Sequence, residues 1–212
     1  MDKLTLHSKD FEMALLALDQ SKAESIIRKA VGEGSPMEVA SKLVSDTLQH
    51  IGEAWEDGKL ALSQVYMSGV ICETIIDKLL PPASPLRMDQ PKMAIGVFED
   101  YHLLGKRIIY STLRASGFEL MDLGGGLKTD HLVRIVQEEK IKILLLSVLM
   151  LPSALRVKEV KEKLAGSQVK IVVGGAPFRL DNQLWLEVGA DACGKDSADA
   201  LEIVTKLMGE KV

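Results

Sequence analysis

The sequence predicts a helical bundle followed by an α/β domain with a five-stranded, doubly wound parallel sheet. Three observations support this fold class. Apolar residues recur at helical spacing through residues 1–80. Residues 81–92 then contain four prolines in twelve positions, which neither a helix nor a strand can accommodate. From residue 93 to residue 212, strand-like and helix-like segments alternate. We therefore expect a cap domain at 1–80, a linker at 81–92 and an α/β domain at 93–212.

The cap domain is expected to contain four helices joined by short connections, which is typical of a bundle. Ser35 is expected to cap the third helix, with Pro36 in its first turn, and Ser63 is expected to cap the fourth. The expected helices span about 10–19, 22–32, 36–55 and 63–80.

The second domain is expected to alternate five strands with five helices. The expected strands are 93–98, 118–123, 142–147, 170–175 and 191–193. The expected helices are 105–115, 130–138, 155–164, 182–188 and 198–208. This order predicts a flavodoxin-like sheet of the Rossmann type. Right-handed crossovers then place the carboxyl ends of all strands at one edge, where such sheets bind ligands.

Composition and charge exclude several classes of protein. With 47% apolar and 26% charged residues in 212, the chain can bury a core, which excludes a disordered or disulfide-stapled class. No apolar run approaches the ~20 residues that span a bilayer. The net charge of −4 argues against nucleic acid or an anionic membrane as a partner. Cys72 and Cys193 are expected to be reduced thiols, so we expect a cytoplasmic protein.

Loops at the predicted ligand edge carry residues suited to binding. An imidazole can bind a metal through one ring nitrogen when an acceptor holds the other, and Asp100 is placed to do this for His102. A loop histidine that only hydrogen-bonds to its neighbouring carboxylate is the simpler alternative. The candidate residues at this edge are Asp100, His102, Gly105, Ser147, Leu149, Ser153, Gly174 and Gly175.

The glycines at this edge have two interpretations. Gly105, Gly174 and Gly175 allow either close approach of the backbone to a ligand or simply tight turns. No G-x-G-x-x-G fingerprint follows the first predicted strand, and the sequence has no Walker loop. Residues 124–126, three consecutive glycines, are expected to form a flexible turn.

Taken in order, these signatures resemble one family. The Asp-x-His-x-x-Gly pattern, the two serines and the Gly-Gly pair look like the cobalamin-binding domain of methionine synthase and of corrinoid methyl-carrier proteins. The N-terminal part is similar to the helical cap that precedes that domain, including the stretches 55–58 and 62–68. The resemblance therefore covers nearly the whole chain and implies a cobalt-containing corrinoid, cobalamin, as the cofactor.

The resemblance implies a role for each residue near the metal. His102 would be the lower axial ligand of cobalt and replace the cofactor's own dimethylbenzimidazole. Asp100 would accept the other imidazole N–H, and Ser153 would hydrogen-bond to Asp100. Ser153 is also placed to cap the helix that follows it.

The resemblance also implies how the displaced nucleotide tail of the cofactor is held. Ser147 would hydrogen-bond to the benzimidazole, and Leu149 belongs to the same signature. Gly105 and the pair Gly174–Gly175 would leave room for the tail between the sheet and its helices.

In the cap, Val65, Tyr66 and Met67 are candidates for the surface over the corrin ring, although apolar residues at helical spacing are usually plain core. The chain departs from the family pattern at Glu99, where glycine is frequent, and at Leu103, where aspartate is usual. In the cap, Ala61 stands where methyl carriers often have phenylalanine.

The function implied by the resemblance is that of a methyl carrier. The chain would shuttle a methyl group between donor-side and acceptor-side methyltransferases and would have no catalytic nucleophile or base of its own. A cobalamin-binding sensory module is the alternative, although positions 65 and 66 lack the Glu-His of light-responsive regulators. A receiver-like domain without cobalt is disfavoured, because the third predicted strand ends in Ser147 rather than a phosphoacceptor.

Overall fold

The computed structural model describes residues 5–32, 36, 39–79 and 90–209, and these form two compact units. The first, the helical unit, comprises the N-terminal part through residue 90 together with residues 111–119. The second, the sheet unit, comprises residues 91–110 and 120–212. Residues 80–89, most of the expected linker, lie outside the described part.

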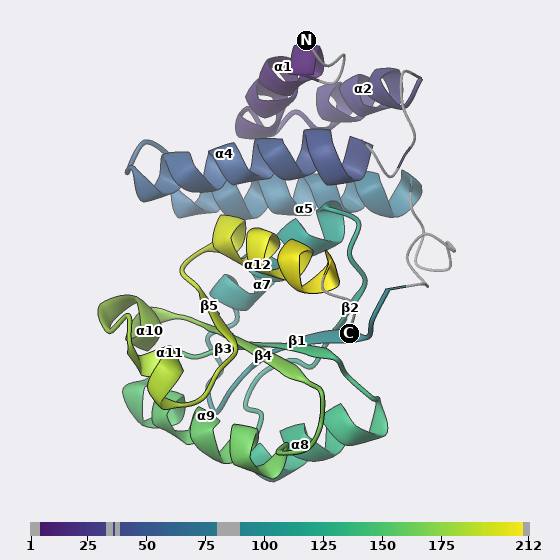
Figure 1. Cartoon of the computed structure of the whole chain (residues 1–212). Coiled ribbons are helices and arrows are strands. Elements are labelled where there is room, and N and C mark those ends of the chain that lie inside the picture. The colour runs from purple at the N-terminus through teal and green to yellow at the C-terminus, as the bar shows by residue number, and fades with distance from the viewer. Residues whose placement is uncertain (1–4, 33–35, 37–38, 80–89, 210–212) are drawn as a thin grey trace. The chain divides into compact units, whose positions relative to one another are not determined.

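The helical unit is built from consecutive helices packed around an apolar core (Figure 1). Its largest fully buried side chains are Phe11, Leu15, Ile27, Ile51, Ile75, Ile76 and Leu113. Asp19 caps the second helix by accepting a hydrogen bond from the Lys22 amide at 2.9 Å. The helices are α1 (Thr5–Leu16), α2 (Gln20–Val31), the π-helical turn η1 (Val39–Val44), α4 (Ser45–Glu56) and α5 (Leu62–Leu79).

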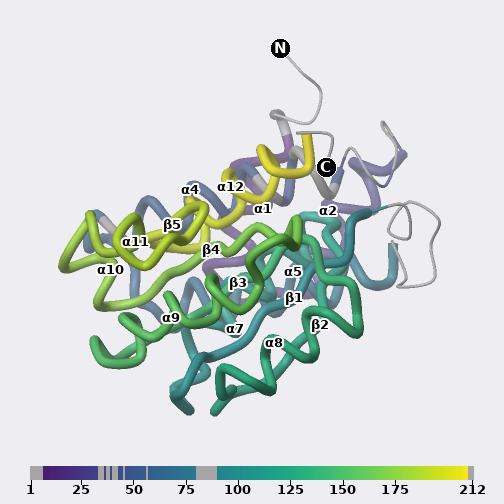
Figure 2. Tube along the Cα trace, turned by 60° about the horizontal axis from the view of Figure 1, so that its bottom comes forward, coloured from purple at the N-terminus to yellow at the C-terminus, as the bar shows by residue number. Residues whose placement is uncertain are grey.

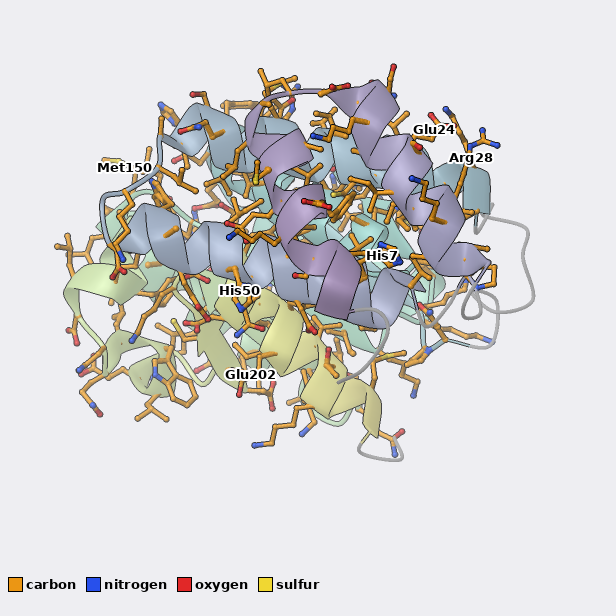
Figure 3. All side chains as sticks on the ribbon, turned by 90° about the horizontal axis from the view of Figure 1, so that it is seen from above. His7, Glu24, Arg28, His50, Met150 and Glu202 are labelled. Carbon is orange, nitrogen blue, oxygen red and sulfur yellow. The ribbon has the colours of Figure 1, made fainter. Side chains whose placement is uncertain are left out.

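Two local expectations for this unit need correction. The helix predicted for 36–55 is divided into η1 and α4. The fourth predicted helix, α5, begins at Leu62 rather than after Ser63, and the side chain of Gln64 accepts the Ala61 amide hydrogen at 2.9 Å. Ser63 is therefore not its cap. Ser35 lies outside the described residues. On the surface of α2, Arg28 donates to Glu24 at 2.7 Å (Figure 3).

The sheet unit contains five parallel strands, as the sequence predicted, and their order is β2-β1-β3-β4-β5 (Figure 2). The three central strands are the most buried, which explains their nearly continuous apolar sequences. The strands are β1 (Met93–Val97), β2 (Leu120–Asp122), β3 (Ile143–Ser147), β4 (Lys170–Gly174) and β5 (Ala192–Gly194).

Helices cover both faces of this sheet (Figure 1). One face packs on α8 (Thr129–Glu138), α9 (Leu151–Lys163), α10 (Ala176–Leu180) and α11 (Leu184–Glu187), whose apolar residues share one core with the strands. The other face carries α7 (Leu104–Ala115) and α12 (Ser197–Gly209). The sequence did not predict α10, and it placed the start of α9 at residue 155, four positions too late. Among the described residues, no helix is long and apolar enough to cross a membrane.

The strand order places a switch point between β1 and β3. The chain leaves β1 toward β2 on one side and returns to β3 on the other, so the connections after β1 and β3 diverge. Ligands of doubly wound sheets bind in the crevice at this point. The two diverging connections carry His102 and Leu149, respectively.

Candidate functional site

His102 lies in the loop between β1 and α7 and is held by the carboxylate of Asp100. The distance from His102 Nδ1 to Asp100 Oδ1 is 2.5 Å. Because an ionised carboxylate can only accept, Nδ1 carries the proton and Nε2 presents its lone pair. The side chain of His102 is 76% exposed, and no hydrogen bond from the described residues reaches Nε2. The imidazole is therefore oriented as an open ligand at the edge of the sheet.

Asp100 is buried, and its carboxylate organises the loop around it. Besides the imidazole, Asp100 Oδ1 accepts the amide hydrogens of Tyr101 at 2.6 Å and His102 at 2.9 Å. Desolvation alone would raise the pKa of Asp100, but these hydrogen bonds outweigh it and hold the pKa below its usual value. Asp100 is thus an anion that fixes both the backbone of the loop and the ring of His102.

The glycine segment 124–126, which follows β2, contacts the His102 loop. The Gly126 amide donates to the carbonyl of Asp100 at 2.6 Å. A Cβ on Gly126 would lie 2.5 Å from the ring of Tyr101, and one on Gly125 would lie 2.9 Å from Leu103. The left-handed φ of Gly126, +68°, also suits glycine. The segment expected to be a flexible turn is therefore a hydrogen-bonded platform for the loop, which the sequence analysis missed.

The connection after β3 forms the other side of the site. Ser147 ends β3 and is half-buried, whereas Leu149 and its neighbour Met150 (Figure 3) are exposed. Ser153 lies in the first turn of α9 and is buried, while the N-cap of that helix is Met150. The expectation that Ser153 caps the helix is therefore wrong. Among the described residues no hydrogen bond joins Ser153 to Asp100, whereas the implied hydrogen bond between His102 and Asp100 is present.

Small residues form a row across the carboxyl edge of the sheet. In register, Ser147 of β3 pairs with Gly174 of β4, and Gly174 pairs with Gly194 of β5. A small pocket lies at this row. Its walls are apolar apart from Ser147, and they come from β1, β3, β4, β5, α7 and α12: Ile95, Ile109, Leu145, Leu146, Ser147, Val172, Val173, Gly174, Gly194 and Ala200. The hydroxyl of Ser147 is the polar side-chain group of this lining.

The predicted site glycines Gly105, Gly174 and Gly175 differ in whether packing excludes a side chain at their position. A Cβ on Gly175 would lie 1.9 Å from the Val148 carbonyl oxygen, and one on Gly174 would lie 2.8 Å from that of Gly194. The fold itself therefore excludes side chains at both positions. At Gly105 a Cβ would meet only the hydroxyl of Ser147, at 3.9 Å. This glycine is not needed for packing, and it borders the same serine as the pocket.

The cap candidates lie on α5 of the helical unit. Val65 is buried in that unit, and Tyr66 and Met67 are partly exposed. Val65 therefore contributes to the core of the helical unit. The role of these three residues over a corrin ring stays a prediction.

The pocket wall includes two residues that the sequence analysis did not name, Gly194 and Ala200. Both are small, and Gly194 follows a short strand, but nothing in their local sequence separates them from ordinary packing residues. Only the register of β5 beside β4 reveals them. The described residues contain no cluster of three or more His, Cys, Asp or Glu side chains suited to a metal ion.

Two family models match the chain. A B12 binding domain matches residues 92–205, and a second B12 binding domain matches residues 8–80. The chain is 32% identical over 199 residues to the trimethylamine corrinoid protein of Methanosarcina barkeri, with 89% of this chain and 90% of that protein covered.

Two solved structures share the fold. A cobalamin-binding protein from Desulfitobacterium hafniense has a TM-score of 0.77 at 24% identity, covering 97% of this chain and 98% of that one. The methanol:cobalamin methyltransferase complex of Methanosarcina barkeri has a TM-score of 0.66 at 22% identity, covering 100% and 82%. The match of the family model to more than half of the chain decides the assignment: the chain belongs to the B12-binding family of corrinoid proteins, and its cofactor is cobalamin.

Proposed function

We propose that this protein is a corrinoid methyl carrier that holds cobalamin base-off/His-on, with His102 as the lower axial ligand. The observation that carries the proposal is the orientation of His102. Its Nδ1–H is held by a buried carboxylate, and Nε2 is left open at the switch point of the sheet. A carboxylate that accepts the far N–H raises the basicity of a metal-binding imidazole.

The nucleotide tail of the cofactor is assigned to the pocket at the carboxyl edge of the sheet. Apolar walls and a single hydroxyl, from Ser147, suit a displaced benzimidazole. Gly105 supports the same assignment, because its missing side chain leaves space beside Ser147 that packing does not require.

The proposed partners are a donor-side and an acceptor-side methyltransferase. Support comes from the names of the relatives: one is a trimethylamine corrinoid protein, and one structure is that of a methanol:cobalamin methyltransferase complex. When bound, the cobalt supplies the chemistry of accepting and releasing the methyl group. The chain contributes the axial imidazole, the carboxylate that orients it and the pocket that holds the tail.

The visible absorption spectrum of the cobalamin-loaded protein tests this proposal. We expect the wild-type protein to show the base-off/His-on spectrum and His102→Ala to lose it. His131→Ala is the matched control, because His131 is an exposed histidine on α8 and is not part of this loop. A spectrum that is the same in His102→Ala and the wild type would refute the ligand assignment.

A further inference from the structure

Glu99 occupies an unusual position, at the point where the chain leaves β1 for the His102 loop. Its φ is +53°, a left-handed conformation that is unfavourable for a residue with a Cβ. Glycine would adopt this conformation without strain. Even so, the side chain of Glu99 is only 7% exposed, so its carboxylate is turned into the protein rather than into solvent. An unfavourable backbone and a buried charge persist together only where other contacts hold them.

The contacts that hold Glu99 come from two other elements. Arg156 Nη1, on α9, lies 2.7 Å from Oε1 and 2.9 Å from Oε2 of Glu99. Lys128, the N-cap residue of α8, approaches the same carboxylate at 3.8 Å. The remaining guanidinium nitrogens of Arg156 face Glu159 at 3.3 Å and 3.4 Å. The first residue of the loop is thus tied to the N-cap of α8 and to the second turn of α9.

From Glu99 the restraint continues along the backbone to His102. The Glu99 amide donates to the Leu127 carbonyl at 3.0 Å. The next residue, Asp100, accepts from Gly126 through its carbonyl and from His102 through its carboxylate. A change in the direction of the chain at Glu99 would therefore move the acceptor that orients the imidazole.

We infer that the Glu99–Arg156 ion pair positions the His102 loop for ligation. The two residues are positioning residues, since neither is placed against the metal. The inference rests on the proposed role of His102 and extends it to the residues that set the geometry of the loop. An ordinary ion pair between surface side chains would add little to stability and would not affect the loop. The readouts must therefore report on the loop itself.

The first readout is amide hydrogen exchange of the cofactor-free protein, followed at Tyr101 and His102. The amides of both residues donate to Asp100. Arg156→Gln and Glu99→Gln should each speed this exchange about tenfold, because a charge-assisted bond that restrains the loop is lost. Arg156→Lys, which keeps a cation, should recover part of the protection. Lys163→Gln is the matched control, because it breaks an ion pair between α9 and Asp130 of α8 that does not involve the loop.

The second readout is the His-on fraction in the visible spectrum after loading with cobalamin. Arg156→Gln and Glu99→Gln should lower it, and Lys163→Gln should not. Glu99→Gly distinguishes the effect of the ion pair from that of the backbone conformation, because glycine allows the left-handed turn but has no carboxylate. The inference is overturned if Glu99→Gly matches the wild type in both readouts, or if Arg156→Gln matches Lys163→Gln. His102→Ala tests the proposed function separately, because it removes the ligand and leaves the ion pair intact.

Discussion

At the scale of single residues, the tautomer of His102 decides whether the loop can bind a metal. A neutral imidazole has one donor and one acceptor nitrogen, and only the acceptor can coordinate. Asp100 selects the tautomer, because its carboxylate cannot donate and accepts a hydrogen bond from Nδ1–H, with Nδ1 and Oδ1 2.5 Å apart. The pKa of Asp100 is lowered below its usual value despite desolvation, so it stays ionised at neutral pH. The buried charge is stabilised by three hydrogen bonds from two adjacent residues.

Replacing Asp100 by asparagine should weaken ligation by His102. The carboxamide is neutral and polarises the imidazole less, and loss of such a partner typically costs about 10- to 100-fold in metal affinity. The measurement is the His-on fraction at neutral pH. Ser153→Ala is the informative comparison: in the absence of a hydrogen bond between Ser153 and Asp100, it should leave the fraction unchanged. An equal loss in both variants would contradict this and indicate that Ser153 acts on His102 through a hydrogen bond to Asp100.

The sequence could predict the Asp100–His102 pair because the two residues are separated by a single position, so their contact is local. The position of Ser153 was harder to predict. It depends on where α9 begins, and Pro152 is compatible with a first helical turn as well as with a loop. The restraint of Glu99 by Arg156 spans 57 residues and leaves no pattern in the local sequence.

At the scale of elements, strands and connections come so close together at the carboxyl edge of the sheet that some positions exclude a side chain. Gly175 has φ +121° and sits against the carbonyl of Val148. A Cβ on Gly105, in the first turn of α7, would meet only the hydroxyl of Ser147, at the ordinary contact distance of 3.9 Å. In the sequence both are glycines at strand–helix junctions. The sequence alone could not distinguish close approach of the backbone to a ligand from a tight turn at either position. The five strands were predicted because their apolar runs and turn residues are local, whereas α10 is a five-residue helix without a clear period.

Gly175→Ala and Gly105→Ala should therefore have opposite effects. Gly175→Ala should destabilise the cofactor-free protein by about 3 kcal/mol or more, because its Cβ would overlap a backbone oxygen. Gly105→Ala should leave stability unchanged or raise it by up to about 1 kcal/mol, as expected in a helix, but should weaken cobalamin binding. Urea denaturation and cofactor titration measure the two effects. Unchanged cobalamin affinity in Gly105→Ala would contradict the assignment of the tail pocket.

At the scale of the whole molecule, each of the two units is made of two separate segments of the chain. Residues 111–119, the end of α7 and the start of the next segment, belong by contact to the helical unit. Arg114, only 5% exposed, donates to Asp77 at 2.6 Å and also pairs with Glu119. Ser111 donates to Glu73 at 2.7 Å. The proline-rich segment at 81–92 could be recognised from composition, but these contacts join segments 37 and 38 residues apart and have no local signature.

The ion pair between Asp77 and Arg114 should therefore hold residues 111–119 in the helical unit. Asp77→Asn should lower the free energy of unfolding by about 1–2 kcal/mol, because a buried guanidinium loses one of its charged partners. It should also speed amide exchange in residues 111–119. Lys78→Gln is the matched control on the same helix: its pair with Glu24 is more than half exposed on the lysine side, so the cost should stay below about 0.5 kcal/mol. If both variants unfold at the same urea concentration, the Asp77–Arg114 pair does not anchor this segment.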